Sequence, residues 1–419
     1  MNDEPGPAVN DDDADEVTAA PTATTTEKKR HPRLRRRIII GAIAVVLAAG
    51  LGGGYWAWNA SAQSRETAAA TSVQTQLQAQ IDAAHAFNAR LSAVQGVTTR
   101  IHSVVESSDF AADALAEAAP LGAALSAMDA LAKAAPADPP ATTTPNEPAG
   151  ETAGYRWPWQ LTSDAEHLES QAAAAERAAA DLRTAAAQTA DAGRTLASAE
   201  AAYFAALAAH ANATITDSPL SNRSIQAPLT ELIDEAQNPS MSASRDGTFL
   251  TSMVDAEARV RDSQATNQAH LNDPAWSVRN EIESYARSLS DGVALEFVWA
   301  PEVAGYGEDW LSGTTQTWDT NGSNGPGSVE YTYAIISLNY SVEEAWNDGP
   351  DARALVTHEV GHSQMYRCWP QYSGPSFSRN DETWATAWSI SYGFDVPGSG
   401  IEAYGRPTDD QISVAGQCH

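Results

Sequence analysis

Basic residues are scarce in this chain of 419 residues, which has 25 lysine and arginine residues against 54 aspartate and glutamate residues. The formal net charge of −29 repels the phosphate backbone of DNA and RNA, so we expect no nucleic-acid partner. The one strongly basic run, residues 28–37 (KKRHPRLRRR), is followed directly by an uncharged apolar segment. A basic run next to an apolar segment indicates that residues 28–37 lie at a membrane surface.

Cysteine is also rare, and both cysteines, Cys368 and Cys418, lie near the C-terminus. Disulfides persist outside the cell membrane, so these two residues are predicted to form one. A metal-binding role for Cys368 is the weaker alternative. It lies six residues after His362, and six residues along a helix turn it away from the face that carries the histidine.

Large apolar residues are almost absent from residues 1–27, which are acidic and rich in Thr, Ala and Pro. A segment of this composition cannot bury enough apolar surface to offset the entropy of folding. We therefore predict that residues 1–37 form a disordered cytoplasmic tail.

The apolar segment that follows, residues 38–58, contains no charge and is long enough for a helix that crosses a bilayer. Basic residues precede it and Trp56 and Trp58 end it. The prediction is a single-pass membrane anchor, with the N-terminus in the cytoplasm and the C-terminal domain outside the cell. The alternative is a secreted protein, cleaved near Ala62 at a small-residue site. Both interpretations place the rest of the chain outside the membrane.

Two Ala-rich segments within residues 63–215 show helical periodicity. Apolar residues recur every three or four positions from Val73 to Val104, which is typical of a coiled coil. A weaker seven-residue stripe runs from Leu168 to Tyr203, and the Pro/Thr-rich residues 135–150 form a linker between the two segments. We predict an Ala-rich helical coiled-coil stalk, whose seam also permits self-association.

Residues 225–419 are predicted to form an α+β domain, with a helical lead-in to about residue 272. Within the lead-in, a third helical stretch over about 247–271 is expected to pack on the stalk helices. Beyond residue 273 alanine becomes rarer, and aromatic, Gly and β-branched residues become more frequent. The patterns predict a helix over 274–289, strands over 293–300, 310–318 and 331–340, and helices over 352–367 and 379–392.

The helix predicted over 352–367 contains the sequence His358-Glu359-Val360-Gly361-His362. The two histidines are four residues apart, so their imidazoles project from one face of a helix and can bind one metal ion. This HExxH pattern is typical of zinc metallopeptidases, in which the glutamate takes a proton from water. We therefore predict Zn2+ as the cofactor, His358 and His362 as ligands, and Glu359 as the catalytic base.

A catalytic zinc site needs a third protein ligand and one position for water. Glu382 is the predicted ligand, because it stands near the start of the helix over 379–392 and follows the motif after a loop long enough for the chain to return. Asp381, Asp395 and Glu402 stay open as alternatives.

The motif HEVGH, followed by a glutamate at the start of a later helix, resembles the gluzincins, which are thermolysin-like zinc metallopeptidases. The resemblance covers roughly residues 273–419. It implies a zincin-like domain with a small sheet above the zinc-binding helix, Glu382 as third ligand, and hydrolysis of proteins or peptides outside the membrane. It also implies that an edge strand, assigned here to 331–340, pairs with the peptide. The metzincin pattern fails, because Met365 and Cys368 replace its glycine and histidine.

Thr386 departs from the related ExxAD element, whose aspartate orients a histidine ligand. Hydrolysis also requires a group that stabilises the oxyanion, and no spacing selects among Tyr392, Tyr404, Arg406 and His419. Two other functions stay open: a non-catalytic zincin-like binding or structural module on the stalk, and a cell-wall amide hydrolase.

Overall fold

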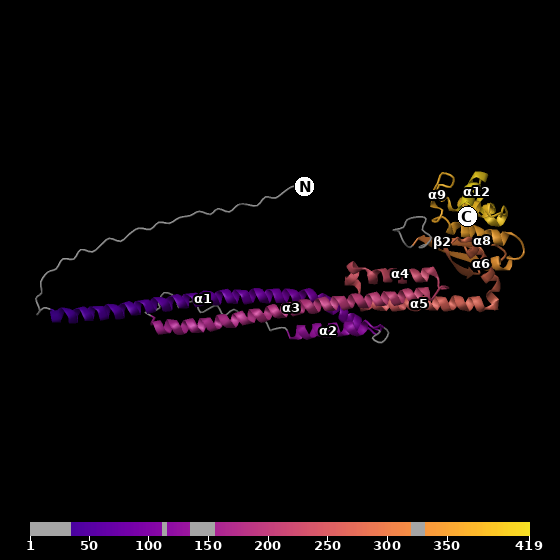
Figure 1. Ribbon diagram of the computed structural model, residues 1–419. Helices are drawn as coiled ribbons and strands as arrows, with labels where there is room; N and C mark the ends of the chain where they lie inside the picture. Colours follow the sequence, from indigo (N-terminus) through magenta and orange to yellow (C-terminus); the bar gives the residue numbers. More distant parts are fainter. Residues whose placement is uncertain (1–34, 111–114, 135–155, 320–331) are drawn as a thin grey trace, which may run out of the picture. The chain divides into compact units, whose positions relative to one another are not determined.

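The computed structural model describes residues 35–110, 115–134, 156–319 and 332–419, with side chains only from residue 52 onwards. Within these ranges the protein is mostly helical, with one small mixed sheet of three strands (Figure 1). The chain divides into two compact units, residues 1–77 with 143–175, and residues 78–142 with 176–419. The predicted linker and nearly all of the predicted tail lie outside the described residues.

The predicted membrane anchor, residues 38–58, has a helical backbone and lies within α1 (Arg35–Val105). The side chains of its first part, up to residue 51, are not among those described. In the described part of the chain, no helix is long and apolar enough to cross a bilayer. The anchor therefore stays a prediction.

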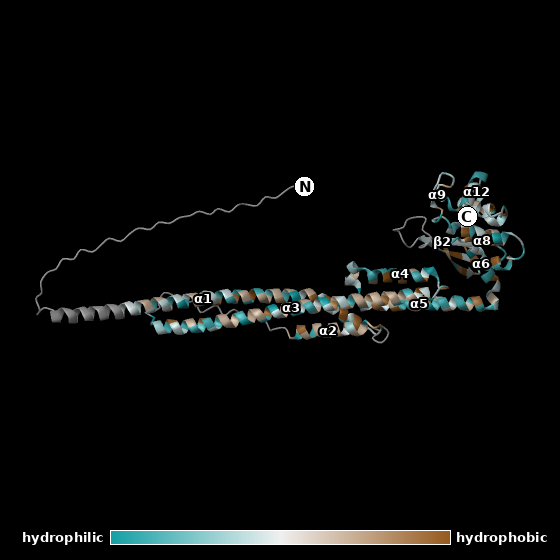
Figure 2. Cartoon of the chain, in the orientation of Figure 1, coloured by the Kyte–Doolittle hydropathy of each residue, from teal (hydrophilic) through white to brown (hydrophobic). Residues whose placement is uncertain are grey.

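The two predicted Ala-rich helices are confirmed as α1 and α3 (Pro158–Thr216). Figure 2 shows polar and apolar residues intermixed along α3 and along the coloured part of α1. In the second unit the helices run parallel, because Phe87 packs in one cluster with Leu182 and, further along, Arg100 forms an ion pair with Glu200. A Cβ atom at Gly193 of α3 would lie 2.8 Å from Cγ1 of Val94 of α1, so the two helices approach closely there.

Five helices share one apolar core in the second unit. They are the end of α1, α2 (Ala118–Lys133), α3, α4 (Arg223–Gln237) and α5 (Gly247–Asn272). The predicted helical lead-in, residues 225–272, includes α4, which contains Pro228 in its second turn and buries Leu229, Ile233 and Ala236 on one of its faces. The helical stretch predicted over about 247–271 is α5, and it packs with the long helices as expected.

The predicted elements of the C-terminal region are confirmed in type. A 3-10 turn and α6 (Ser277–Leu289) precede β1 (Ala294–Ala300), β2 (Gly313–Asp319) and β3 (Thr332–Asn339). The helices that follow are α7 (Tyr340–Glu344), α8 (Asp351–Ser363), α9 (Trp369–Tyr372), α10 (Asp381–Ser391), α11 (Ile401–Tyr404) and α12 (Asp409–Ala415). Cys368 and Cys418 form the predicted disulfide, which ties the end of the chain to the segment after α8.

The strand order is β1-β3-β2, with β1 parallel and β2 antiparallel to β3. The assignment of residues 331–340 to an edge strand is therefore wrong, because β3 is the middle strand. Its sequence gives the physical reason, since Ala334-Ile335-Ile336 belongs to a nearly continuous apolar run, as strands covered on both faces have. Among the described residues, β2 pairs with β3 alone and is the edge strand beside α8.

A second core joins the sheet to its helices. Ile336 of β3 packs with Ile282 of α6 and Val356 of α8, and α10 adds Trp384 and Trp388, both fully buried. Replacing either tryptophan by alanine would cost about 3–5 kcal/mol. This packing fixes α10 against α8, and these two helices carry the residues of the predicted site.

Candidate metal centre

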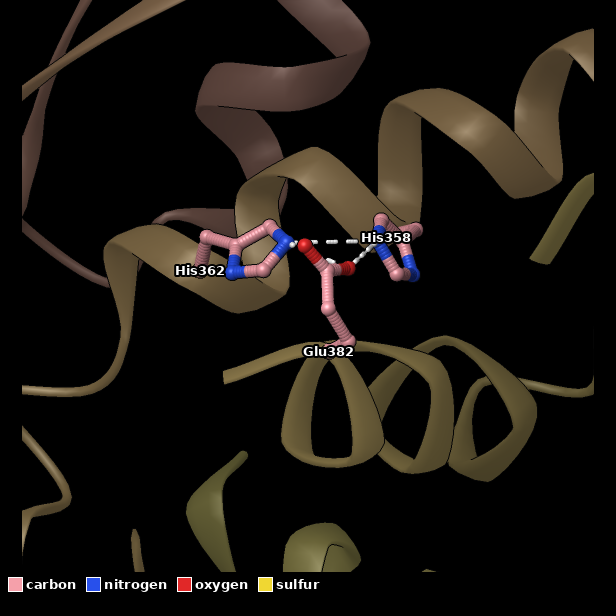
Figure 3. A group of neighbouring side chains, drawn as sticks. All are labelled: His358, His362 and Glu382. Atoms are coloured by element: carbon pink, nitrogen blue, oxygen red, sulfur yellow. Dashed lines mark hydrogen bonds and ion pairs between the residues drawn. The ribbon is translucent and has the colours of Figure 1, made fainter. Parts of the chain in front are cut away.

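His358 and His362 project from α8 toward Glu382, which stands in the first turn of α10 (Figure 3). The Nε2 atoms of the two imidazoles are 3.2 Å apart. An Oε2 atom of Glu382 lies 3.2 Å from Nε2 of His358 and 3.4 Å from Nε2 of His362. The three ligand atoms lie within 4.8 Å of one another, so they form a candidate metal site.

A helix cap positions Glu382. The side chain of Asn380 accepts a hydrogen bond of 2.9 Å from the backbone N–H of Thr383 and so fixes the start of α10. Burial of the Glu382 carboxyl opposes its ionisation, but the adjacent imidazoles of His358 and His362 hold its pKa well below the usual range. The carboxylate is therefore available as a negatively charged oxygen ligand.

The alternative third ligands have other places in the structure. The Asp381 carboxylate accepts a hydrogen bond from the hydroxyl of Tyr372, and Asp395 pairs with Arg406. Glu402 is exposed on α11. None of the three joins the candidate site within the described residues, so Glu382 alone completes it.

Close packing of α8 and α10 brings the ligands together. A Cβ atom at Gly361 would lie 3.0 Å from the Cα of Ala385, so the glycine allows the two backbones to approach. The Nε1–H of Trp384 donates a hydrogen bond of 2.8 Å to the carbonyl of Gly361. The glycine inside the HExxH motif thus serves the contact between the helices that carry the ligands.

A backbone carbonyl orients His358. Its Nδ1 atom lies 3.0 Å from the carbonyl oxygen of Ser399 and 3.4 Å from Oγ1 of Thr386. Donation from Nδ1 to the carbonyl leaves the lone pair of Nε2 directed at the candidate site. Ser399 therefore performs the orienting role that the sequence pattern assigns to an aspartate at position 386.

Gly400 makes this approach of the backbone possible. Its φ of 97° lies in the left-handed region. A Cβ atom there would lie 2.9 Å from Nδ1 of His358 and 2.6 Å from Oγ1 of Thr386. Any larger residue would displace the imidazole or the carbonyl that orients it.

Glu359 is buried beside the ligands and held by the edge strand. Its side chain is 3% exposed, and its Oε2 atom accepts a hydrogen bond of 2.8 Å from Oγ1 of Thr315 on β2. Gly313 leaves space for the carboxylate, because a Cβ atom there would lie 2.8 Å from Oε1 of Glu359. Burial raises the pKa of Glu359, although the nearby His358 and the hydrogen bond from Thr315 act in the opposite direction.

Of the four predicted oxyanion stabilisers, Tyr404 lies at the site. Its ring stacks on that of His358 with the centroids 5.9 Å apart and an angle of 6° between the planes. Burial and the carboxylates of Glu382 and Glu359 raise the pKa of its hydroxyl, which stays a hydrogen-bond donor at neutral pH. The other three make contacts elsewhere: Tyr392 with His419, and Arg406 with Asp395 and Asp409.

Comparison of the chain with protein-family models, curated proteins and solved structures found no match. The interpretation of the site therefore rests on its own geometry. Two imidazoles and one carboxylate converge on one point, with a buried carboxylate and a phenol beside them.

Proposed function

We propose that this chain is a zinc-dependent peptidase. The observation that carries the proposal is the position of Glu359, which is buried next to a three-ligand site and held by Thr315. A structural zinc site usually has four protein ligands and needs no base beside it, whereas a catalytic site has three and keeps one position open. The arrangement of this chain supports the catalytic alternative.

The donor set fits zinc. Two neutral imidazole nitrogens and one carboxylate oxygen are ligands that Zn2+ takes in hydrolytic enzymes, and the carbonyl of Ser399 fixes the tautomer of His358 that such binding requires. A zinc ion held by His358, His362 and Glu382 would supply a Lewis acid that polarises a carbonyl and acidifies water.

Glu359 would then accept a proton from the attacking water and return it to the leaving amine. The hydrogen bond from Thr315 orients the carboxylate for this transfer, and the burial that raises its pKa makes it a stronger base than an exposed glutamate. The ring of Tyr404 stacks on that of His358, so its hydroxyl is the proposed donor that stabilises the oxyanion.

The edge strand suggests how a substrate would lie. Because β3 is the middle strand, β2 takes the role that the sequence assigned to residues 331–340. An extended peptide paired with β2 would run beside Glu359, since Gly313 and Thr315 of this strand contact that residue. We therefore propose proteins or peptides as the substrate class, and a zincin-like fold of the gluzincin type for the C-terminal domain.

The proposed location is outside the cell membrane. The Cys368–Cys418 disulfide supports an extracytoplasmic domain, because such bonds persist in oxidising compartments. Residues 38–58 would anchor the chain, and α1 and α3 would form the stalk that carries the catalytic domain.

The test compares Glu359→Gln with the wild-type full chain. We expect both proteins to contain one zinc ion by elemental analysis, and the variant to lose roughly 10²–10⁴-fold in cleavage of a peptide library. Glu344→Gln, which changes an exposed glutamate of the same domain, is the matched control and should keep both properties. Undiminished cleavage by Glu359→Gln would exclude this residue as the base. Metal without any hydrolysis in the wild type would favour a binding module.

A further inference from the structure

Four tryptophans are exposed together in the first unit. Trp56 and Trp58 lie on α1; about a hundred residues later in the sequence, Trp157 directly precedes α3 and Trp159 lies in its first turn. Their exposed fractions are 76%, 48%, 45% and 53%, respectively. Large aromatic side chains exposed as a group indicate a surface that contacts something other than water.

Ring contacts join the two helices into one surface. The rings of Trp157 and Trp159 stack with centroids 4.8 Å apart, Trp159 lies 6.4 Å from Trp58, and Trp157 lies 6.4 Å from Tyr55. We call Tyr55, Trp56, Trp58, Trp157 and Trp159 the aromatic collar.

Ion pairs fix the two helices in register beside the collar. Arg156, directly before Trp157, binds the carboxylates of Glu66 on α1 and Asp164 on α3. Arg65 of α1 binds Glu169 of α3 at 2.8 Å. The start of α3 is therefore held against α1 at this level, because each of the two arginines contacts carboxylates of the facing helix.

The residue types of the aromatic collar and its place at the end of an apolar segment indicate which kind of partner covers it. Tyr55 to Trp58 end the uncharged segment 38–58, which follows the basic run 28–37. Tryptophan and tyrosine prefer the headgroup region of a bilayer, where the ring is in contact with acyl chains and the polar N–H or O–H with water. We propose that the aromatic collar is a membrane-interface belt, so that the start of α3 returns to the outer surface of the bilayer.

This inference rests on the anchor part of the proposed function and is independent of the catalytic part. It gives the chain two contacts with the bilayer, one at the end of the anchor and one at Trp157 and Trp159. The stalk would then leave the membrane as a pair of helices, which restricts the orientation of the domain it carries.

The experiment measures tryptophan depth in the full chain. Wild type and the double variant W157F/W159F are reconstituted in phosphatidylcholine vesicles with and without lipid brominated near the headgroup, which quenches tryptophan at that depth. We expect the bromolipid-quenched emission to fall about twofold in the double variant, because two of the four interfacial tryptophans are removed. The control W276F changes a tryptophan at the start of α6 in the other unit and should leave the quenched emission unchanged.

Two results would overturn the proposal. Equal quenched emission in wild type and W157F/W159F would show that the start of α3 stands clear of the bilayer. A collar buried against a second copy of the chain would instead give unquenched tryptophans and a dimer in detergent that W157F/W159F weakens. Equal zinc content and helical circular dichroism in all variants exclude misfolding as the cause, and the loss of catalysis in Glu359→Gln leaves this measurement unaffected.

Discussion

The Nδ1 atom of His358 lies 3.0 Å from the carbonyl oxygen of Ser399, and the next residue, Gly400, has a φ of 97°. The left-handed glycine turns this carbonyl toward the imidazole. We expect Gly400→Ala to weaken metal binding about 10- to 100-fold, because its Cβ atom would displace the contact that orients the ligand. Competition titration with a chromogenic chelator measures the affinity.

Gly393→Ala is the matched control for Gly400→Ala. Gly393 has the same φ of 97°, but no atom lies within 4 Å of a Cβ atom placed there. The control should cost about 1 kcal/mol of folding stability through backbone strain and leave the metal affinity unchanged. Equal losses of affinity in both variants would mean that strain, and not the orientation of His358, is responsible.

Glu382 and Asp381 are neighbours in sequence that face different partners. The carboxylate of Glu382 lies against both histidines, whereas that of Asp381 accepts a hydrogen bond from Tyr372. We expect Glu382→Ala to lose the metal during dialysis and Asp381→Asn to retain it, as measured by elemental analysis. Retention of metal by Glu382→Ala together with loss in Asp381→Asn would reverse the ligand assignment.

The ligand set could be predicted from the sequence because it depends on local spacing. His358 and His362 share a helix face whatever the rest of the chain does, and Glu382 stands at the start of a recognisable helix. Ser399 could not be found in this way, because a backbone carbonyl leaves no signature in the residue type. Thr315 was missed for a related reason, since only the pairing of β2 brings it to Glu359.

The remaining differences between the predicted and the observed fold concern the strand order and the helix α4. The apolar pattern predicted the strand at 331–340, but the order of strands depends on contacts distant in sequence, so its place in the middle of the sheet was not predicted. The lead-in was predicted as helical, but α4 was not delimited within it, because Pro228 disfavours a helix interior and the helix is only about four turns long.

We predict that Thr315 orients the carboxylate of Glu359, the proposed base. Its hydroxyl donates to Oε2 of Glu359 at 2.8 Å, and Thr315→Val removes this bond while keeping the shape of the side chain. We expect kcat to fall roughly tenfold with KM nearly unchanged, because the bond acts on the base and not on the substrate. Thr317→Val is the control on the same face of β2, since Thr317 contacts the carbonyl of His362 at 3.4 Å. A change in KM alone would assign Thr315 to substrate binding.

Glu296 of β1 is a buried carboxylate far from the ligand motif in sequence, and it connects the sheet to α4. It is 5% exposed and accepts hydrogen bonds from the backbone N–H and the hydroxyl of Ser224, at 2.5 and 2.6 Å. Burial raises the pKa of its carboxyl, although the hydrogen bonds from Ser224 and the backbone of Arg223 lower it. The folded protein therefore binds this proton more tightly than the unfolded chain does.

The sign of the pH dependence follows from this difference. Between the unfolded and folded pKa values the folded state holds more protons, so the free energy of unfolding falls as the pH rises through that window. Glu296→Gln keeps an acceptor for Ser224 but does not titrate. We expect its stability relative to wild type, measured by urea unfolding, to increase as the pH rises from about 4 toward neutrality. Glu344→Gln, which removes an exposed carboxylate of the same domain, controls for the loss of one negative charge. A relative stability of Glu296→Gln that falls with rising pH would mean that the folded state favours the ionised carboxylate.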